Sequence, residues 1–296
     1  MEKASHRALG YTTAIAQAIF YSMMGIFSKL LYATGLDAQQ VTFLRFAFTV
    51  VILGIVLILW RKHALISRQA AVYVQSIFFF LSAITYLLAV QYMNAGRVTV
   101  VFYTFPAVGA ILDVAFFHAK LTWRVAFALA LSVLGVFFIS NVLLPGAVAI
   151  SPLGVVFSVA SCITFAIYSV LIQKTARVES SFTVTLTLSL VSLAASTVFF
   201  FPEIGATLGI DLYQAALVIG LAVISTILPI ALFIVAIRYI GATKASILSL
   251  AETPASLFLA WIILGETLTI WQGIGTVLIV AAILVVTIKS KDAQEA

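Results

Sequence analysis

One acidic residue, Glu252, lies inside a long apolar stretch, two residues before Pro254. Helical spacing places it on the same face as Ser249 and Ser256. A charge at hydrocarbon depth is costly, so such a carboxyl group is a candidate site by default. It could bind an ammonium group of a solute or exchange a proton. The alternative is a neutral, hydrogen-bonded carboxyl group with a structural role.

Three further charged residues lie near the ends of apolar stretches. Asp113 lies toward the cytoplasmic end of its stretch and could pair with a loop lysine there, which makes it a weaker candidate site than Glu252. Lys29 and Arg45 have long side chains that can extend to a membrane surface while their stems remain in lipid. The sequence therefore favours interfacial positions for these two basic groups.

Several apolar stretches carry aromatic, amide and hydroxyl side chains along one helical face. Such faces could enclose a cavity suited to an organic solute with an apolar part. The alternative is ordinary packing, because hydroxyl and small residues are enriched wherever membrane helices touch. The candidate substrate-binding residues are Gln17, Tyr21, Ser82, Tyr86, Phe102, Tyr103, Ser161, Phe165, Ser249 and Glu252.

Prolines interrupt three of the apolar stretches. A proline removes one helical hydrogen bond and clashes with the preceding turn, so Pro106, Pro229 and Pro254 predict kinks. Pro106 and Pro254 lie at corresponding depths of their stretches, and we expect these two to act as hinges. The alternative is that they only shape the packing.

Catalytic and metal-binding signatures are absent from the sequence. It contains no His-Glu-x-x-His, no Gly-x-Ser-x-Gly and no phosphate-binding Gly-x-x-x-x-Gly-Lys motif. The single cysteine, Cys162, has no histidine or cysteine at metal-ligand spacing. We therefore expect no enzyme activity, no cofactor and no metal. Nucleic acid is not an expected partner, because the basic residues are scattered rather than grouped in a stripe.

The elements that must position these residues are membrane helices. Apolar residues make up 64% of the 296 residues and charged residues only 9%, which excludes a soluble domain. Charged or Gly/Pro-bearing breaks divide the chain into segments of about 20 residues, the length that spans a bilayer. We therefore predict an all-α integral membrane protein with ten transmembrane helices. The predicted spans are 9–32, 40–60, 71–92, 97–117, 123–143, 152–173, 181–201, 213–237, 244–264 and 269–288.

The basic residues also predict an orientation. With the N-terminus in the cytoplasm, 13 of the 16 basic residues fall on the cytoplasmic side, as the positive-inside rule requires. We therefore predict that both termini are cytoplasmic. The 13 residues are Lys3, Arg7, Arg61, Lys62, Arg68, Lys120, Arg124, Lys174, Arg177, Arg238, Lys244, Lys289 and Lys291.

The two halves of the chain resemble each other. The stretch 96–107 aligns with 244–255, with a proline at the same depth of each. We predict a first five-helix repeat over 1–146 and a second over 147–296. Because five is odd, the second copy must be inverted in the membrane. Inverted repeats typically bind a solute near the midplane and alternate its access to the two sides.

Specific motifs carry a resemblance to a known family. They are Phe27-Ser28, Leu44-Arg45-Phe46, Thr253-Pro254 and Leu264-Gly265-Glu266-Thr267-Leu268-Thr269. With ten spans and an inverted repeat, the chain resembles the drug/metabolite transporter superfamily, in the branch built from two EamA-type repeats. The first half departs from the last motif and reads Phe117-His118-Ala119-Lys120-Leu121-Thr122.

Within that branch the chain is most similar to YddG-type exporters of aromatic and other amino acids. The resemblance implies a multi-pass protein of the bacterial inner membrane that exports amino acids or related small metabolites by alternating access. Its partners would be a small-molecule substrate and the lipid bilayer. Efflux of cationic drugs and a non-transporting membrane scaffold are the alternatives. Gly273 and Gly275 let the last span approach a neighbouring helix closely, and a homodimer through them is a further expectation.

Overall fold

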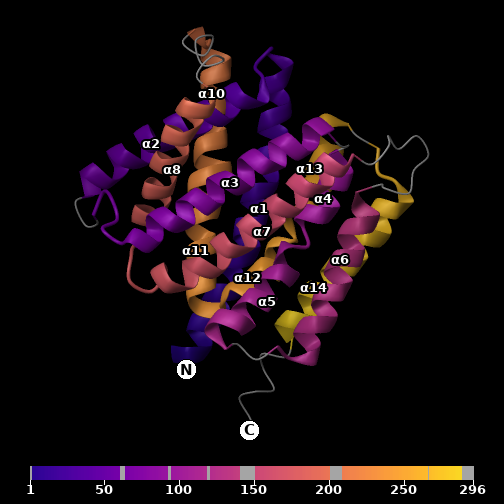
Figure 1. Cartoon of the computed structure of the whole chain (residues 1–296). Coiled ribbons are helices and arrows are strands. Elements are labelled where there is room, and N and C mark those ends of the chain that lie inside the picture. The colour runs from indigo at the N-terminus through magenta and orange to yellow at the C-terminus, as the bar shows by residue number, and fades with distance from the viewer. Residues whose placement is uncertain are drawn as a thin grey trace.

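The computed structural model describes residues 2–60, 64–92, 95–118, 121–140, 151–200, 209–265 and 267–288. Within these ranges the chain is helical and contains no strand (Figure 1). All elements are α-helices except η2, which is a π-helix. The elements are α1 (Glu2–Ala33), α2 (Ala38–Trp60), α3 (Ala70–Tyr92), α4 (Ala95–Phe102), α5 (Phe105–Phe117), α6 (Trp123–Ile139), α7 (Pro152–Thr175), α8 (Ser181–Phe199), α10 (Leu212–Ala222), η2 (Val223–Ile227), α11 (Leu228–Ile240), α12 (Ala242–Ser249), α13 (Glu252–Leu264) and α14 (Ile270–Ile288).

The ten predicted spans all have helical counterparts. In the described ranges, nine helical stretches are long and apolar enough to cross a membrane, and α6 is a shorter apolar helix. The span predicted over 123–143 continues beyond α6 into residues that lie outside the described ranges. The surface is apolar, with Leu59 73% exposed and Phe116 72% exposed, as expected where helices face lipid. The structure therefore confirms the fold class.

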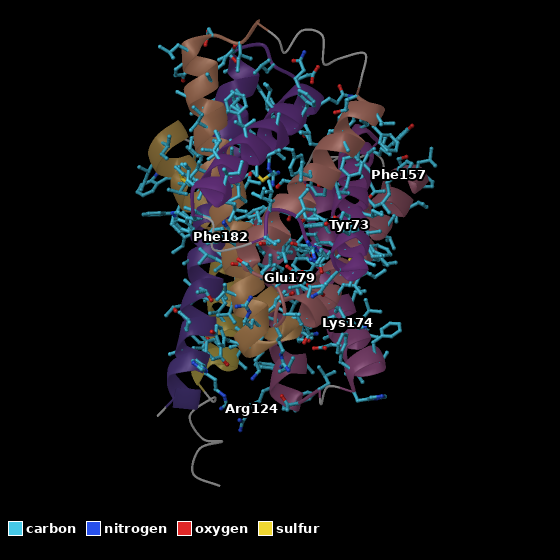
Figure 2. The ribbon with its side chains drawn as sticks, turned by 90° about the vertical axis from the view of Figure 1, so that its left-hand side faces the viewer. Tyr73, Arg124, Phe157, Lys174, Glu179 and Phe182 are labelled. Carbon is cyan, nitrogen blue, oxygen red and sulfur yellow. The ribbon has the colours of Figure 1, made fainter. Side chains whose placement is uncertain are left out.

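Two sides of the bundle can be distinguished. Figure 1 shows α1 beginning at the bottom of the view and α10 reaching the top. We call the side where α1 begins the terminal side, and the side where α1 ends and α2 begins the distal side. Arg124, at the start of α6, lies toward the terminal side in Figure 2.

The helices pack in the pattern that a repeat of five spans requires. Helix α3 packs against α7, and its repeat-related pair is α11 against α1. Likewise α3 against α8 corresponds to α10 against α2. When the two halves are exchanged, three further packed pairs remain the same pairs: α2 with α8, α5 with α12 and α6 with α14. This exchange is what a pseudo-two-fold axis between two halves produces. The predicted boundary at residue 146 lies outside the described residues.

A close approach of two glycines joins α6 to α14. A Cβ atom on Gly135 would lie 2.6 Å from the Ile279 Cγ1 atom and 2.9 Å from the Gly275 carbonyl oxygen. Gly275 therefore faces α6 inside the chain, which confirms the close approach to a neighbouring helix, whereas its expected place on a dimer surface is wrong. Gly273 has open space around it and faces outward.

The connection that follows α2 is tied to the connection that follows α7. The Ser67 hydroxyl group donates to Glu179 Oε1 at 2.9 Å, and the Tyr73 hydroxyl group donates to the Ser67 carbonyl oxygen at 2.9 Å. Figure 2 shows Tyr73, Glu179 and Phe182 on the face turned toward the viewer. The bond from Ser67 to Glu179 joins one predicted half of the chain to the other, and the bond from Tyr73 fixes Ser67 within the first half.

Candidate functional site

Two broken helices meet at the centre of the molecule. The fourth span is interrupted between α4 and α5, with Pro106 in the first turn of α5, and the ninth is interrupted between α12 and α13, close to Pro254. Proline has no N–H group to continue a helical ladder, so the breaks fall where the sequence predicts kinks. The Tyr103 hydroxyl group donates to Glu252 Oε1 at 3.2 Å. The two interruptions thus place a phenol and a carboxyl group in contact across the predicted halves.

The third predicted kink coincides with a different irregularity. Pro229 is the second residue of α11, which follows the π-helix η2, so the eighth span is built from α10, η2 and α11. A π-helical turn leaves the ordinary i to i−4 pattern and is frequent at functional sites. In this turn the Thr226 hydroxyl group donates to the Leu221 carbonyl oxygen at 2.9 Å.

A central cavity of about 300 Å³ adjoins these breaks. Its wall is formed by side chains from both predicted halves, with Glu252 and Arg45 as its charged groups. Aromatic rings form much of the remaining wall. The rings that line it are Tyr21, Tyr32, Phe46, Phe79, Tyr86, Phe102, Tyr103 and Phe165.

The aromatic rings support one another. The Phe102 ring centroid lies 5.3 Å from the centroids of both Tyr86 and Phe165, in edge-to-face arrangements. Phe105 packs against Phe165 with the centroids 4.6 Å apart. Such aromatic pairs are stabilising beyond the area they bury, so the rings form a defined wall.

A smaller inner chamber of about 70 Å³ lies next to the central cavity and shares several of its residues. Gln17 and Ser249 line this chamber, and the Ser249 hydroxyl group donates to Gln17 Oε1 at 2.8 Å. That bond ties α1 to α12.

The structure brings most of the predicted binding residues together. Ser161 does not line the central cavity or the inner chamber, because it is fully buried and donates to the Ser82 carbonyl oxygen at 2.9 Å. Gln17 and Ser249 belong to the inner chamber. The other predicted binding residues line the central cavity: Tyr21, Ser82, Tyr86, Phe102, Tyr103, Phe165 and Glu252.

The central cavity extends toward the distal side of the bundle. Tyr32, in the last turn of α1, lines it and is 45% exposed. Ser28 and Thr42, which also lie near that side, are partly exposed residues of the same wall. A solute could therefore enter from the distal side.

Asp113 joins three helices near the terminal side. Its Oδ1 atom accepts a hydrogen bond from Gln173 Nε2 at 2.7 Å, and its Oδ2 atom accepts one from the Thr243 hydroxyl group at 2.8 Å. The carboxyl group, only 6% exposed, thus joins α5 to α7 and α12. The sequence suggested a loop lysine as its partner, but the observed partners are uncharged side chains from two other helices. We call these three residues the terminal latch.

Arg45 is a charged residue of the cavity wall that was not among the predicted binding residues. It is 7% exposed and lines the central cavity, so its expected interfacial position is wrong, whereas Lys29 is exposed. The neighbours of Arg45 explain why it is buried. The Arg45 Nε atom donates to the Thr226 hydroxyl group at 2.8 Å, and the guanidinium carbon lies 5.0 Å from the Phe46 ring centroid.

A signal for Arg45 was nevertheless present in the sequence. Thr42, Arg45 and Thr49 follow helical spacing along the second span and form a polar face. A polar face predicts that an arginine points into the protein interior. It is a better predictor of the position of Arg45 than the distance of Arg45 from the end of the span.

Comparison with known proteins adds two likenesses. An uncharacterized transporter of Archaeoglobus fulgidus is 28% identical over 267 residues, which cover 89% of this chain and 92% of that protein. A protein of known crystal structure superposes with a TM-score of 0.83 at 18% identity, covering 98% of this chain and 99% of the other. At that identity the second likeness concerns the fold alone.

The model of the EamA-like transporter family matches the chain twice, over residues 8–141 and 152–288. Together these two stretches contain nearly all the helices described above. The chain therefore belongs to the EamA-like transporter family.

Proposed function

We propose that this transporter is a secondary carrier that exports amino acids, including aromatic ones, or related small metabolites by alternating access. The observation that carries the proposal is the central cavity, in which the Glu252 carboxyl group lies among aromatic rings at the meeting point of two broken helices. A carboxyl group suits a substrate ammonium group. The rings suit an apolar or aromatic side chain.

The size of the cavity agrees with a small organic solute. Ligand cavities typically measure about 300–1,000 Å³. The central cavity, at about 300 Å³, lies at the lower end of this range. It therefore favours single amino acids over large drugs.

The conformation supports alternating access. The central cavity extends to the distal side, whereas near the terminal side the hydrogen bonds of the terminal latch hold α5, α7 and α12 together. If the basic residues set the orientation in a bacterial inner membrane, the terminal side faces the cytoplasm. The conformation described is then the outward-facing one, from which an exporter releases its substrate. We expect Pro106 and Pro254 to serve as the hinges between the two conformations.

The proposal is tested with the purified protein in liposomes. Uptake and release of a panel of labelled amino acids are measured with and without a proton gradient. Saturable flux of aromatic amino acids is the expected result, and its response to the gradient reports coupling to protons. Absence of flux for every amino acid of the panel would refute the proposal.

Efflux of cationic drugs is the second candidate function, because a carboxyl group among aromatic rings also suits an organic cation. In that case Glu252 is the required counter-charge. Replacing Glu252 by glutamine should then abolish the flux of a cationic dye, and the same variant should only reduce the flux of amino acids. A cationic dye added to the panel distinguishes the two functions.

A further inference from the structure

Arg45 is a buried cation that has no acidic hydrogen-bond partner in the part of the chain that the structure describes. Among the described residues, its hydrogen-bond acceptors are the Thr226 hydroxyl group at 2.8 Å and, more weakly, the Met24 sulfur atom at 3.5 Å. Its Nη2 atom has no acceptor among these residues. A buried charge is normally paired, and one inside a membrane is costly enough to mark a binding site.

The rest of its environment holds the guanidinium group in place. Thr226 accepts from Arg45 Nε and donates its own proton to the Leu221 carbonyl oxygen, so the π-helical turn η2 fixes the Thr226 hydroxyl group. The Phe46 ring packs at the guanidinium group. Thr226 occupies the Nε edge of the guanidinium group, so the buried Nη2 atom, which has no acceptor among the described residues, is the donor left for an anion once the cavity wall adjusts around it.

Arg45 and Glu252 line the same cavity and come from opposite predicted halves. An organic cation would be attracted by Glu252 and repelled by Arg45, whereas a molecule with one negative and one positive group can satisfy both. Free α-amino acids carry these two groups on one carbon atom. An arginine is also well matched to a carboxylate, because its planar fork can donate two parallel hydrogen bonds.

We infer that Arg45 binds the α-carboxylate of the substrate while Glu252 binds its α-ammonium group, so that the carrier selects zwitterionic amino acids over amines and over carboxylic acids. The inference rests on the proposed function, since it names the chemical groups that the same cavity recognises. Thr226 acts as a positioning residue for Arg45.

The test compares three ligands that share one ring and one chain length. They are phenylalanine, phenethylamine, which lacks the carboxylate, and 3-phenylpropionate, which lacks the ammonium group. Competition of each unlabelled compound against labelled phenylalanine is measured in proteoliposomes. For the native protein we expect phenylalanine to compete at concentrations about 10- to 100-fold lower than the other two, as loss of a charge-assisted hydrogen-bonded pair implies.

Arg45→Gln removes the cation while keeping a polar side chain. In this variant the affinity for phenylalanine should fall by the same factor, so that phenylalanine and phenethylamine become nearly equal competitors. Arg45→Lys, which keeps the charge but loses the fork, should lie between the two. Lys29→Gln is the matched control, because Lys29 is a basic residue of the same side that does not line the cavity, and this variant should keep the native preference.

Each outcome bears on the inference. A native preference retained in both Arg45 variants would overturn it, and would leave the proposed transport of amino acids standing. If Arg45→Gln is not recovered as a monodisperse protein, the comparison rests on Arg45→Lys, whose unchanged preference would also overturn the inference.

If the native protein transports no amino acid, the proposed function fails first. In that case ligand-induced shifts of the melting temperature by the three compounds still decide the inference, and equal shifts by phenylalanine and phenethylamine would overturn it.

Discussion

Removing the terminal latch should open the terminal side of the transporter. In Asp113→Ala, Gln173 and Thr243 lose their common acceptor, and both hydrogen bonds join helices that must separate when the terminal side opens. A hydrogen bond to a charged group contributes about 1.5–3 kcal/mol. The lower value for each of two bonds gives about 3 kcal/mol, or roughly a 150-fold shift of the equilibrium between the two conformations.

The shift can be measured as the reactivity of a single thiol. Cys162 is the only cysteine, so Cys162→Ala provides a background without thiols, and Ser249→Cys places a reporter in the inner chamber. A membrane-impermeant thiol reagent is added from the terminal side. The labelling rate follows the fraction of molecules open to that side, so Asp113→Ala should raise it by one to two orders of magnitude over the same background with Asp113 intact.

Asp37→Ala provides the matched control. The Asp37 carboxyl group accepts its hydrogen bond from the Gln40 backbone within one end of α2, so it does not join the two halves. Its removal should leave labelling from the terminal side unchanged. Equal labelling rates with and without Asp113, in proteins with similar melting temperatures, would refute the role of the latch.

Three further predictions concern the packing, the hinges and the contact of Tyr103 with Glu252. Gly275→Val should lower stability by about 1–3 kcal/mol, because a side chain there meets α6, whereas Gly273→Val should be nearly neutral; melting temperatures in detergent decide this. Pro106→Ala should restore helical hydrogen bonding and slow transport more than it weakens binding, seen as a fall in the maximal flux at unchanged KM. Tyr103→Phe removes the hydroxyl group that donates to Glu252 and should change substrate affinity severalfold, as measured by equilibrium binding. An unchanged affinity would mean that this hydrogen bond does not contribute to substrate binding.

The sequence was sufficient to predict the spans, the breaks and part of the cavity wall. These features depend on local properties: runs of apolar residues set the spans, prolines set the breaks, and helical spacing groups side chains such as Tyr86 and Phe165 on interior faces. Helical spacing alone could not separate Ser161, which packs behind Ser82, from residues that face the cavity.

Contacts between distant helices could not be predicted in this way. The partners of Asp113 come from α7 and α12, and the site of Arg45 depends on a π-helical turn more than 170 residues away along the chain. The periodicity of a single sequence shows which face of a helix is buried, but it does not show which other helix that face contacts. For the same reason Gly275 resembled a dimer contact, although it packs against α6 of its own chain.

The central claim, that amino acids cross the membrane through the central cavity, is tested most directly by counterflow. Liposomes containing the transporter are loaded with unlabelled phenylalanine, and entry of labelled phenylalanine is followed. Ala83→Trp should fill the cavity that Ala83 lines, whereas Ala130→Trp adds the same ring at an exposed position of α6. We predict transient accumulation of label with the native protein and with Ala130→Trp, and none with Ala83→Trp. Undiminished counterflow in Ala83→Trp, or its absence in the native protein, would contradict the account.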